Sequence, residues 1–156
     1  MVKLVFALPV LLLACGPVEQ PERLRYVAAV EIDMRTPADR ADLLAMLRRH
    51  AAAGGLHVDD VSEPAAQNTA LPPSERPTIY VGVWRGSADD DLEVTVDDTF
   101  HQGRPWIVFS RGARPELAAA LREALLRDIS RRWPGARRLP IDPSGGLAEE
   151  RTSPTP

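Results

Sequence analysis

The chain has 156 residues, 44% of them hydrophobic and 26% charged, which is the size and composition of one globular domain. Its 22 acidic side chains outnumber its 19 basic ones, so the formal net charge of −3 gives no support for binding nucleic acid, which requires a basic surface. Cys15 is the only cysteine, which excludes a disulfide within the chain.

The first fourteen residues predict a targeting segment rather than part of the fold. Lys3, the only lysine in the chain, precedes an uncharged and almost wholly apolar run over residues 4–13. This run is far shorter than the roughly 20 residues that a helix needs to cross a bilayer. A short basic start, a short apolar stretch and a small residue before the cleavage point are typical of a secretory signal peptide.

The end of this segment, Leu12-Leu13-Ala14-Cys15, resembles the lipobox of bacterial lipoproteins. The resemblance implies cleavage between Ala14 and Cys15, a diacylglycerol on the Cys15 thiol and an N-acyl lipid on the new amino terminus. Two or three acyl chains meet the requirement for stable anchoring. Gly16 follows where enteric lipoproteins kept at the inner membrane usually carry Asp, which favours the outer membrane, facing the periplasm. The alternative is an ordinary signal peptide with an incidental cysteine.

Residues 15–22 are polar and contain proline, which predicts a lipidated tether before a single domain at residues 23–141. Residues 24–34 alternate in hydropathy, which predicts a strand with Tyr26, Ala28 and Val30 on one face and Glu31 on the other. Residues 36–54 predict a helix, because Thr36 suits the N-cap, Pro37 the first position and Asp39 a capping box.

A weaker strand is predicted at residues 56–61. Residues 62–77 contain four prolines and no periodicity, which predicts a loop that is either functional or, as we expect, a mobile insertion. Three further strands are predicted at residues 78–84, 92–96 and 106–109, and their short connections predict an antiparallel meander. In the middle strand, Glu93, Thr95 and Asp97 are expected to point outward.

Apolar residues recur at helical spacing over residues 115–133, which predicts a second long helix. A short edge strand at residues 139–141 and a disordered tail at residues 142–156 are expected to follow. The pattern predicts an α+β fold: a two-layer sandwich with a mainly antiparallel sheet of five or six strands and two helices on one face. This arrangement is similar to a ferredoxin-like sandwich with an additional strand.

The densest acidic stretches are Asp89-Asp90-Asp91 and Asp97-Asp98. Calcium takes six to eight oxygen ligands, but these two turns flank one strand and so lie roughly 17–20 Å apart. We interpret them as solvated turn residues, although calcium binding stays open. His50, His57 and His101 lack the local pairing of zinc ligands, so no metal site is predicted.

Two pairs of tryptophan and arginine lie near predicted strand ends, and Trp and Arg are enriched at protein interfaces. The candidate interface residues are Trp84, Arg85, His101, Arg104 and Trp106. The alternative is that one or both tryptophans pack in the core. His101 is also the candidate general base, with Asp97 or Asp98 to orient it, but neither Ser87 nor Ser110 has the motif of a nucleophile.

We therefore expect a lipoprotein of the bacterial cell envelope whose periplasmic domain binds protein and is not an enzyme. No cofactor is expected apart from the lipids on Cys15. The expected partners are the membrane, through the lipid anchor, and an envelope protein, but not nucleic acid. The alternatives are an inhibitor or immunity lipoprotein against a secreted toxin or hydrolase, and a hydrolase that uses His101.

Overall fold

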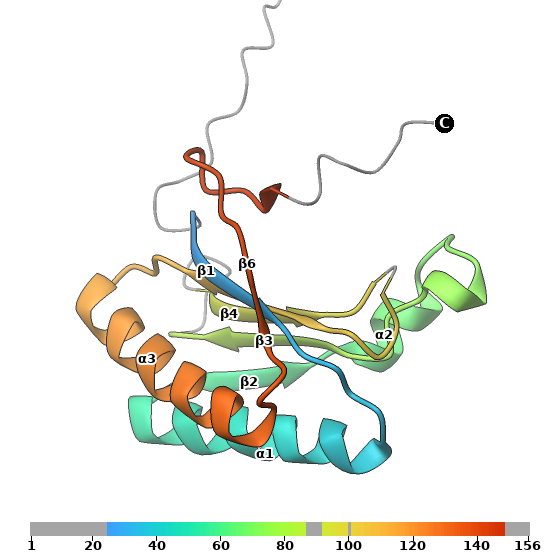
Figure 1. Cartoon of the computed structure of the whole chain (residues 1–156), viewed down its shortest axis with the longest axis horizontal. Coiled ribbons are helices and arrows are strands. Elements are labelled where there is room, and N and C mark those ends of the chain that lie inside the picture. The colour runs from blue at the N-terminus through green and yellow to red at the C-terminus, as the bar shows by residue number, and fades with distance from the viewer. Residues whose placement is uncertain (1–24, 87–91, 100, 149–156) are drawn as a thin grey trace, which may run out of the picture.

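The computed structural model describes residues 25–86, 92–99 and 101–148, which form one six-stranded sheet with helices packed against it (Figure 1). All neighbouring strands are antiparallel, in the order β2-β3-β4-β5-β1-β6. The strands are β1 (Tyr26–Glu31), β2 (His57–Asp60), β3 (Tyr80–Trp84), β4 (Leu92–Asp97), β5 (Trp106–Ser110) and β6 (Arg137–Leu139). The helices are α1 (Pro37–Gly54), α2 (Ser62–Gln67) and α3 (Pro115–Arg132), with a 3₁₀ turn, η2, at Pro73–Glu75. The predicted α+β fold is confirmed.

Two crossovers are interleaved in this sheet. α1 joins β1 to β2 and α3 joins β5 to β6, and the strands of each pair run in the same direction. β1 lies between β5 and β6, which is the arrangement of a ferredoxin-like sandwich, with β3 and β4 added between β2 and β5. The edges of the sheet are therefore β2 and the short β6.

α1 and α3 lie side by side on one face of the sheet, as Figure 1 shows. α1 begins as predicted: the Thr36 hydroxyl accepts a hydrogen bond from the Asp39 amide at 3.2 Å, and the Asp39 carboxylate accepts one from the Thr36 amide at 2.9 Å. Both helices bury one side against the sheet, forming the main core. Its largest fully buried side chains include Leu43, Leu47, Ile79, Ile107, Phe109, Leu125 and Ile129.

Two β-bulges change which face a side chain occupies. In β1, Tyr26 pairs with Ser110 and Ala28 with Phe109, so Val27 is an additional residue. Tyr26 therefore packs with a second apolar cluster, on the face of the sheet opposite α1 and α3, rather than with Ala28. This cluster consists of Ala29, Val108, Leu139 and Leu147. Glu93 is the additional residue in β4, and its side chain is only 1% exposed. The predictions that Tyr26 shares a face with Ala28 and that Glu93 points to solvent are therefore wrong, because a bulge interrupts strict alternation.

Two segments hold more structure than predicted. Residues 62–77 form α2 and η2 rather than an unstructured loop. Residues 142–148 form a compact turn, in which Ile141 bridges to Leu147 and Leu147 is buried against Ala29 and Val108. The Asp142 carboxylate accepts hydrogen bonds from the amides of Ser144 at 2.7 Å and Gly146 at 3.2 Å. These bonds and the burial of Leu147 order a stretch whose composition predicted disorder.

Several predicted features lie outside the described residues: the signal peptide, the Cys15 lipidation site, the Asp89–Asp91 stretch and the end of the tail, residues 149–156. In the part of the chain that the structure describes, no helix combines the length and the hydropathy needed to span a membrane.

Candidate functional site

A row of five side chains crosses the face of the sheet opposite α1 and α3. Register pairs connect Tyr80 in β3 to Asp97, Asp97 to Trp106, Trp106 to Glu31, and Glu31 to Arg137 in β6. Partners directly opposite each other in an antiparallel sheet point to the same face, so these five side chains share one surface. We call this surface the open-face row.

Glu31 lies between Trp106 and Arg137 in this row, and only 7% of it is exposed. Its Oε2 accepts a hydrogen bond at 3.0 Å from Nε1 of Trp106 and lies 3.4 Å from a guanidinium nitrogen of Arg137. Its Oε1 is paired with the guanidinium of Arg104. Burial acts to raise the pKa of Glu31, but the hydrogen bonds from Trp106 and Arg104 and the charges of Arg104 and Arg137 outweigh it. The pKa therefore lies below its ordinary value, and the carboxylate stays charged at neutral pH.

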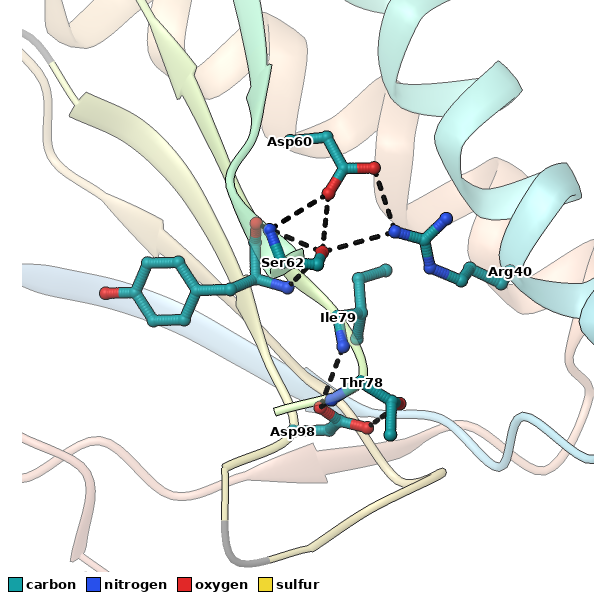
Figure 2. Close-up of polar contacts among 7 residues, drawn as sticks. Arg40, Asp60, Ser62, Thr78, Ile79 and Asp98 are labelled. Carbon is teal, nitrogen blue, oxygen red and sulfur yellow. Dashed lines mark hydrogen bonds and ion pairs between the residues drawn. The ribbon is translucent and has the colours of Figure 1, made fainter. Parts of the chain in front are cut away.

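His101 and Arg104 reach the open-face row from the turn between β4 and β5. The His101 ring stacks on Trp106, with ring centroids 5.2 Å apart and planes inclined by 29°. Asp98, which is 1% exposed, holds this turn against the start of β3 (Figure 2). Its carboxylate accepts hydrogen bonds from the amides of Thr78 at 2.7 Å, Ile79 at 3.0 Å and Gly103 at 3.0 Å. A buried carboxylate thus fixes the turn that carries two exposed candidate residues.

A second polar cluster lies where β2 meets α2, also shown in Figure 2. The Ser62 hydroxyl donates to Oδ1 of Asp60 at 2.5 Å and accepts from the Tyr80 amide at 2.8 Å and from Arg40 at 3.2 Å. Burial acts to raise the pKa of Asp60, but the hydrogen bonds from Ser62 and the charge of Arg40 bring it below its ordinary value. Because Ser62 is buried and its hydroxyl has three partners, this cluster joins α2 and β3 rather than presenting a nucleophile.

We compared the chain with known proteins. No protein-family model, curated protein or solved structure matches it.

The five candidate interface residues do not form one surface. His101, Arg104 and Trp106 come together around Glu31, but Trp84 and Arg85 lie at the opposite end of the strands. Trp84 pairs with Leu92 and Trp106 with Asp97, five residues apart along β4, which is about 17 Å. The predicted grouping is therefore wrong in this part, because an antiparallel meander places the end of β3 far from the start of β5.

Trp84 and Arg85 have local partners instead. The Trp84 ring lies over Gly82, where an added Cβ would be 2.4 Å from the indole nitrogen. Arg85 donates to the buried carboxylate of Glu93 at 2.5 Å. We assign both residues to the packing of this end of the sheet.

The carboxylates next to His101 are bonded elsewhere. Asp97 accepts hydrogen bonds from the amide and the hydroxyl of Thr99 at 2.7 and 2.6 Å, while Asp98 is occupied by the backbone contacts above. Neither carboxylate contacts the His101 ring, so the predicted orientation of a general base is not observed. Over residues 25–86, 92–99 and 101–148, no group of three or more His, Cys, Asp or Glu side chains is arranged to hold a metal ion.

Sequence reasoning missed Glu31, Tyr80 and Arg137 as members of this surface. Alternation within β1 placed Glu31 on the open face, but nothing in the sequence showed that it faces Trp106, 75 residues away. That pairing depends on the strand order and register, which local patterns do not determine.

Proposed function

We propose that the chain is a lipid-anchored lipoprotein of the bacterial cell envelope whose periplasmic domain binds a partner protein and does not catalyse a reaction. The lipobox resemblance at Leu12-Leu13-Ala14-Cys15 supports the anchoring. Gly16 supports a location on the outer membrane, facing the periplasm. Eight tether residues, 15–22, reach at most about 28 Å, which keeps the domain close to the membrane.

The single observation that carries the binding role is the arrangement around Glu31. A buried carboxylate holds one indole and two guanidinium groups on a face that the helices leave open. Trp and Arg are the side chains most often responsible for binding energy in interfaces. Side chains that are already held in place lose less conformational entropy on binding, which favours affinity.

A binding role also accounts for His101 better than a hydrolase does. Its ring stacks on Trp106 as part of the exposed surface. The nearby carboxylates are bonded to other groups, and the buried Ser62 hydroxyl already has three partners. The contacts that occupy His101, the Asp97 and Asp98 carboxylates and the Ser62 hydroxyl therefore support a non-catalytic role.

Anchoring is tested by labelling bacterial cells that express the full chain with radioactive palmitate. We expect the native chain to take up label and the variant Cys15→Ser to take up none, because the thiol is the acceptor of the diacylglyceryl group. The variant Gly16→Ala keeps the thiol and serves as a control that should be labelled. A native chain without label would contradict the anchoring.

Binding is tested by cross-linking the full chain in intact envelopes. We expect a reproducible cross-linked species that is lost in the double variant Arg104→Glu with Trp106→Ala. The control variant Arg48→Glu changes an exposed residue of α1, on the other side of the molecule, and should keep the species. Absence of any species would contradict the binding role, and persistence in the double variant would exclude the open-face row as the site.

A further inference from the structure

The edge of the sheet beside β6 is only partly covered. β6 pairs with Ala29, Val30 and Glu31, and the next residue is Pro140, which lacks an amide hydrogen and cannot donate to the ladder. Beyond the end of β6, the turn at residues 142–148 covers the start of β1, where the Tyr26 amide donates a hydrogen bond to the Gly145 carbonyl at 3.1 Å. Val27, which lies there, is 41% exposed, a high value for a large apolar side chain in a sheet.

An apolar pocket of about 290 Å³ lies where β1, β6 and α3 meet. Its walls come from β1, α3, β6 and the residue that follows Pro140. The lining residues that matter are Val27, Ala28, Leu126, Leu139 and Ile141. Small-molecule sites have volumes of about 300–1,000 Å³, so this pocket has room for an apolar side chain rather than a cofactor.

The pocket continues into a wider groove of about 520 Å³ between α3 and β6, since Leu126 and Arg138 line both. We call the two together the α3–β6 groove. Its rim carries Arg127, Arg131 and Arg138 but only one acid, Glu123. Arg131 pairs with Asp128, whereas Arg127 and Arg138 form no ion pair with any described residue.

We propose that the α3–β6 groove binds an acidic, extended segment of a partner protein, with one apolar side chain of that segment in the pocket. The charge of the rim supports this occupant, because guanidinium groups pair with carboxylates in a bidentate manner and stay charged at all physiological pH values. The position of β6 at the edge of the described sheet, with β1 as its one strand neighbour, supports an extended segment, since peptides commonly add to a sheet edge.

This site goes beyond the proposed function and is separate from the open-face row. Arg137 and Arg138 are neighbours in β6, and successive side chains of a strand point to opposite faces. Arg137 pairs with Glu31 on the open face, while Arg138 lines the groove on the side of α3. Variants of the groove therefore leave the open-face row in place, and the two surfaces can be tested independently.

The experiment uses the full chain in non-ionic detergent and a fluorescein-labelled peptide with blocked ends, Glu-Glu-Leu-Glu-Glu, followed by fluorescence anisotropy. We expect saturable binding. Replacing the peptide leucine with serine, or its glutamates with glutamine, should weaken binding about tenfold or more, because the pocket and the rim each lose a partner. The protein variant Arg127→Glu with Arg138→Glu should abolish binding, while the control Arg48→Glu should bind normally.

Four outcomes would overturn the proposal. They are no binding of the acidic peptide, equal binding by the Arg127→Glu, Arg138→Glu variant, binding that appears only after residues 149–156 are deleted, and a dimer that dissociates in that variant. The third would assign the groove to the chain's own acidic end, and the fourth to a second copy. Unfolding curves of the exposed-site variants should match the native curve. A cross-linked envelope partner that is insensitive to these variants would leave the proposed function standing while the groove proposal fails.

Discussion

The carboxylate of Glu31 accepts a hydrogen bond at 3.0 Å from the indole nitrogen of Trp106, its direct partner across β1 and β5. This bond gives a buried acid a neutral donor in addition to two arginines. It also fixes the indole ring on which His101 stacks. The buried Glu31 carboxylate therefore holds Trp106, and through it His101, in place on the open face of the sheet.

Replacing Glu31 with Ala should destabilise the domain by about 1–3 kcal/mol, because the Trp106 donor loses its partner and two guanidinium groups lose their counter-charge. Glu31→Gln keeps one acceptor and should cost less. Urea unfolding measures the stability of both Glu31 variants, and tryptophan fluorescence reports on the surroundings of the Trp106 ring. The control Glu123→Ala changes an exposed acid and should be nearly neutral. Equal stability of native chain and Glu31→Ala would contradict this role.

Arg85 and Glu93 form an ion pair that is almost wholly buried, with side chains 14% and 1% exposed. Arg85→Met should destabilise the domain by about 3–5 kcal/mol, because a buried carboxylate is left without a counter-charge. Adding Glu93→Leu to that variant should restore most of the loss, since apolar replacements of both partners remove the unpaired charge. Urea unfolding gives the free energy of unfolding of the single and double variants, which tests this prediction. A double variant as unstable as the single one would show that the bulge itself, and not the charge, is responsible.

Asp98→Asn should destabilise the domain by about 2–3 kcal/mol, because one acceptor oxygen becomes an NH₂ group that faces other donors. Three backbone amides and the Thr78 hydroxyl now share the two carboxylate oxygens. Amide exchange at Gly103 should become faster, and this local effect separates the loss of the turn from a general loss of stability. The exposed control Asp33→Asn should leave both measurements unchanged.

Asp128 on α3 should make stability depend on pH at the acid end. Hydrogen bonds from His50, Arg49 and Arg131 outweigh burial and lower the pKa of Asp128 to about 2. The folded pKa lies below the unfolded one, so this contribution is complete above about pH 4 and is lost as the pH falls through about 2. Asp128→Asn should be less stable than the native chain at pH 7, and the difference should shrink toward pH 2. A difference that stays constant over this range would contradict the prediction.

Gly82→Ala should displace the Trp84 ring, because the added Cβ would lie 2.4 Å from the indole nitrogen and 2.8 Å from Cε2. We expect a cost of about 1–3 kcal/mol and a changed near-ultraviolet circular dichroism spectrum. Gly135→Ala is the matched control, since a Cβ there meets nothing within 4 Å. It should leave the spectrum unchanged, and an unaltered spectrum for Gly82→Ala would show that the ring has space to move.

The helices were predictable because their signals are local. The capping box of Thr36 and Asp39 lies within four residues, and the apolar positions of α3 recur at a fixed spacing. Secondary structure at residues 62–67 and 73–75 was missed because these helices are short and α2 has no side-chain cap. The turn at residues 142–148 was missed because its order depends in part on contacts with strands distant in sequence: Leu147 is buried against Ala29 and Val108, and the Gly145 carbonyl accepts a hydrogen bond from the Tyr26 amide.

The sequence by itself determined the type and order of the long elements, since alternation and helical periodicity act between neighbours along the chain. It also carries the lipobox resemblance at Cys15. Only the tertiary structure decided which side chains meet. The bulges at Val27 and Glu93 change the face of the sheet to which neighbouring side chains point, and the register places Glu31 opposite Trp106. A shift of one residue reverses the face of every side chain in a strand, so a surface built across five strands exists only once packing has selected one register.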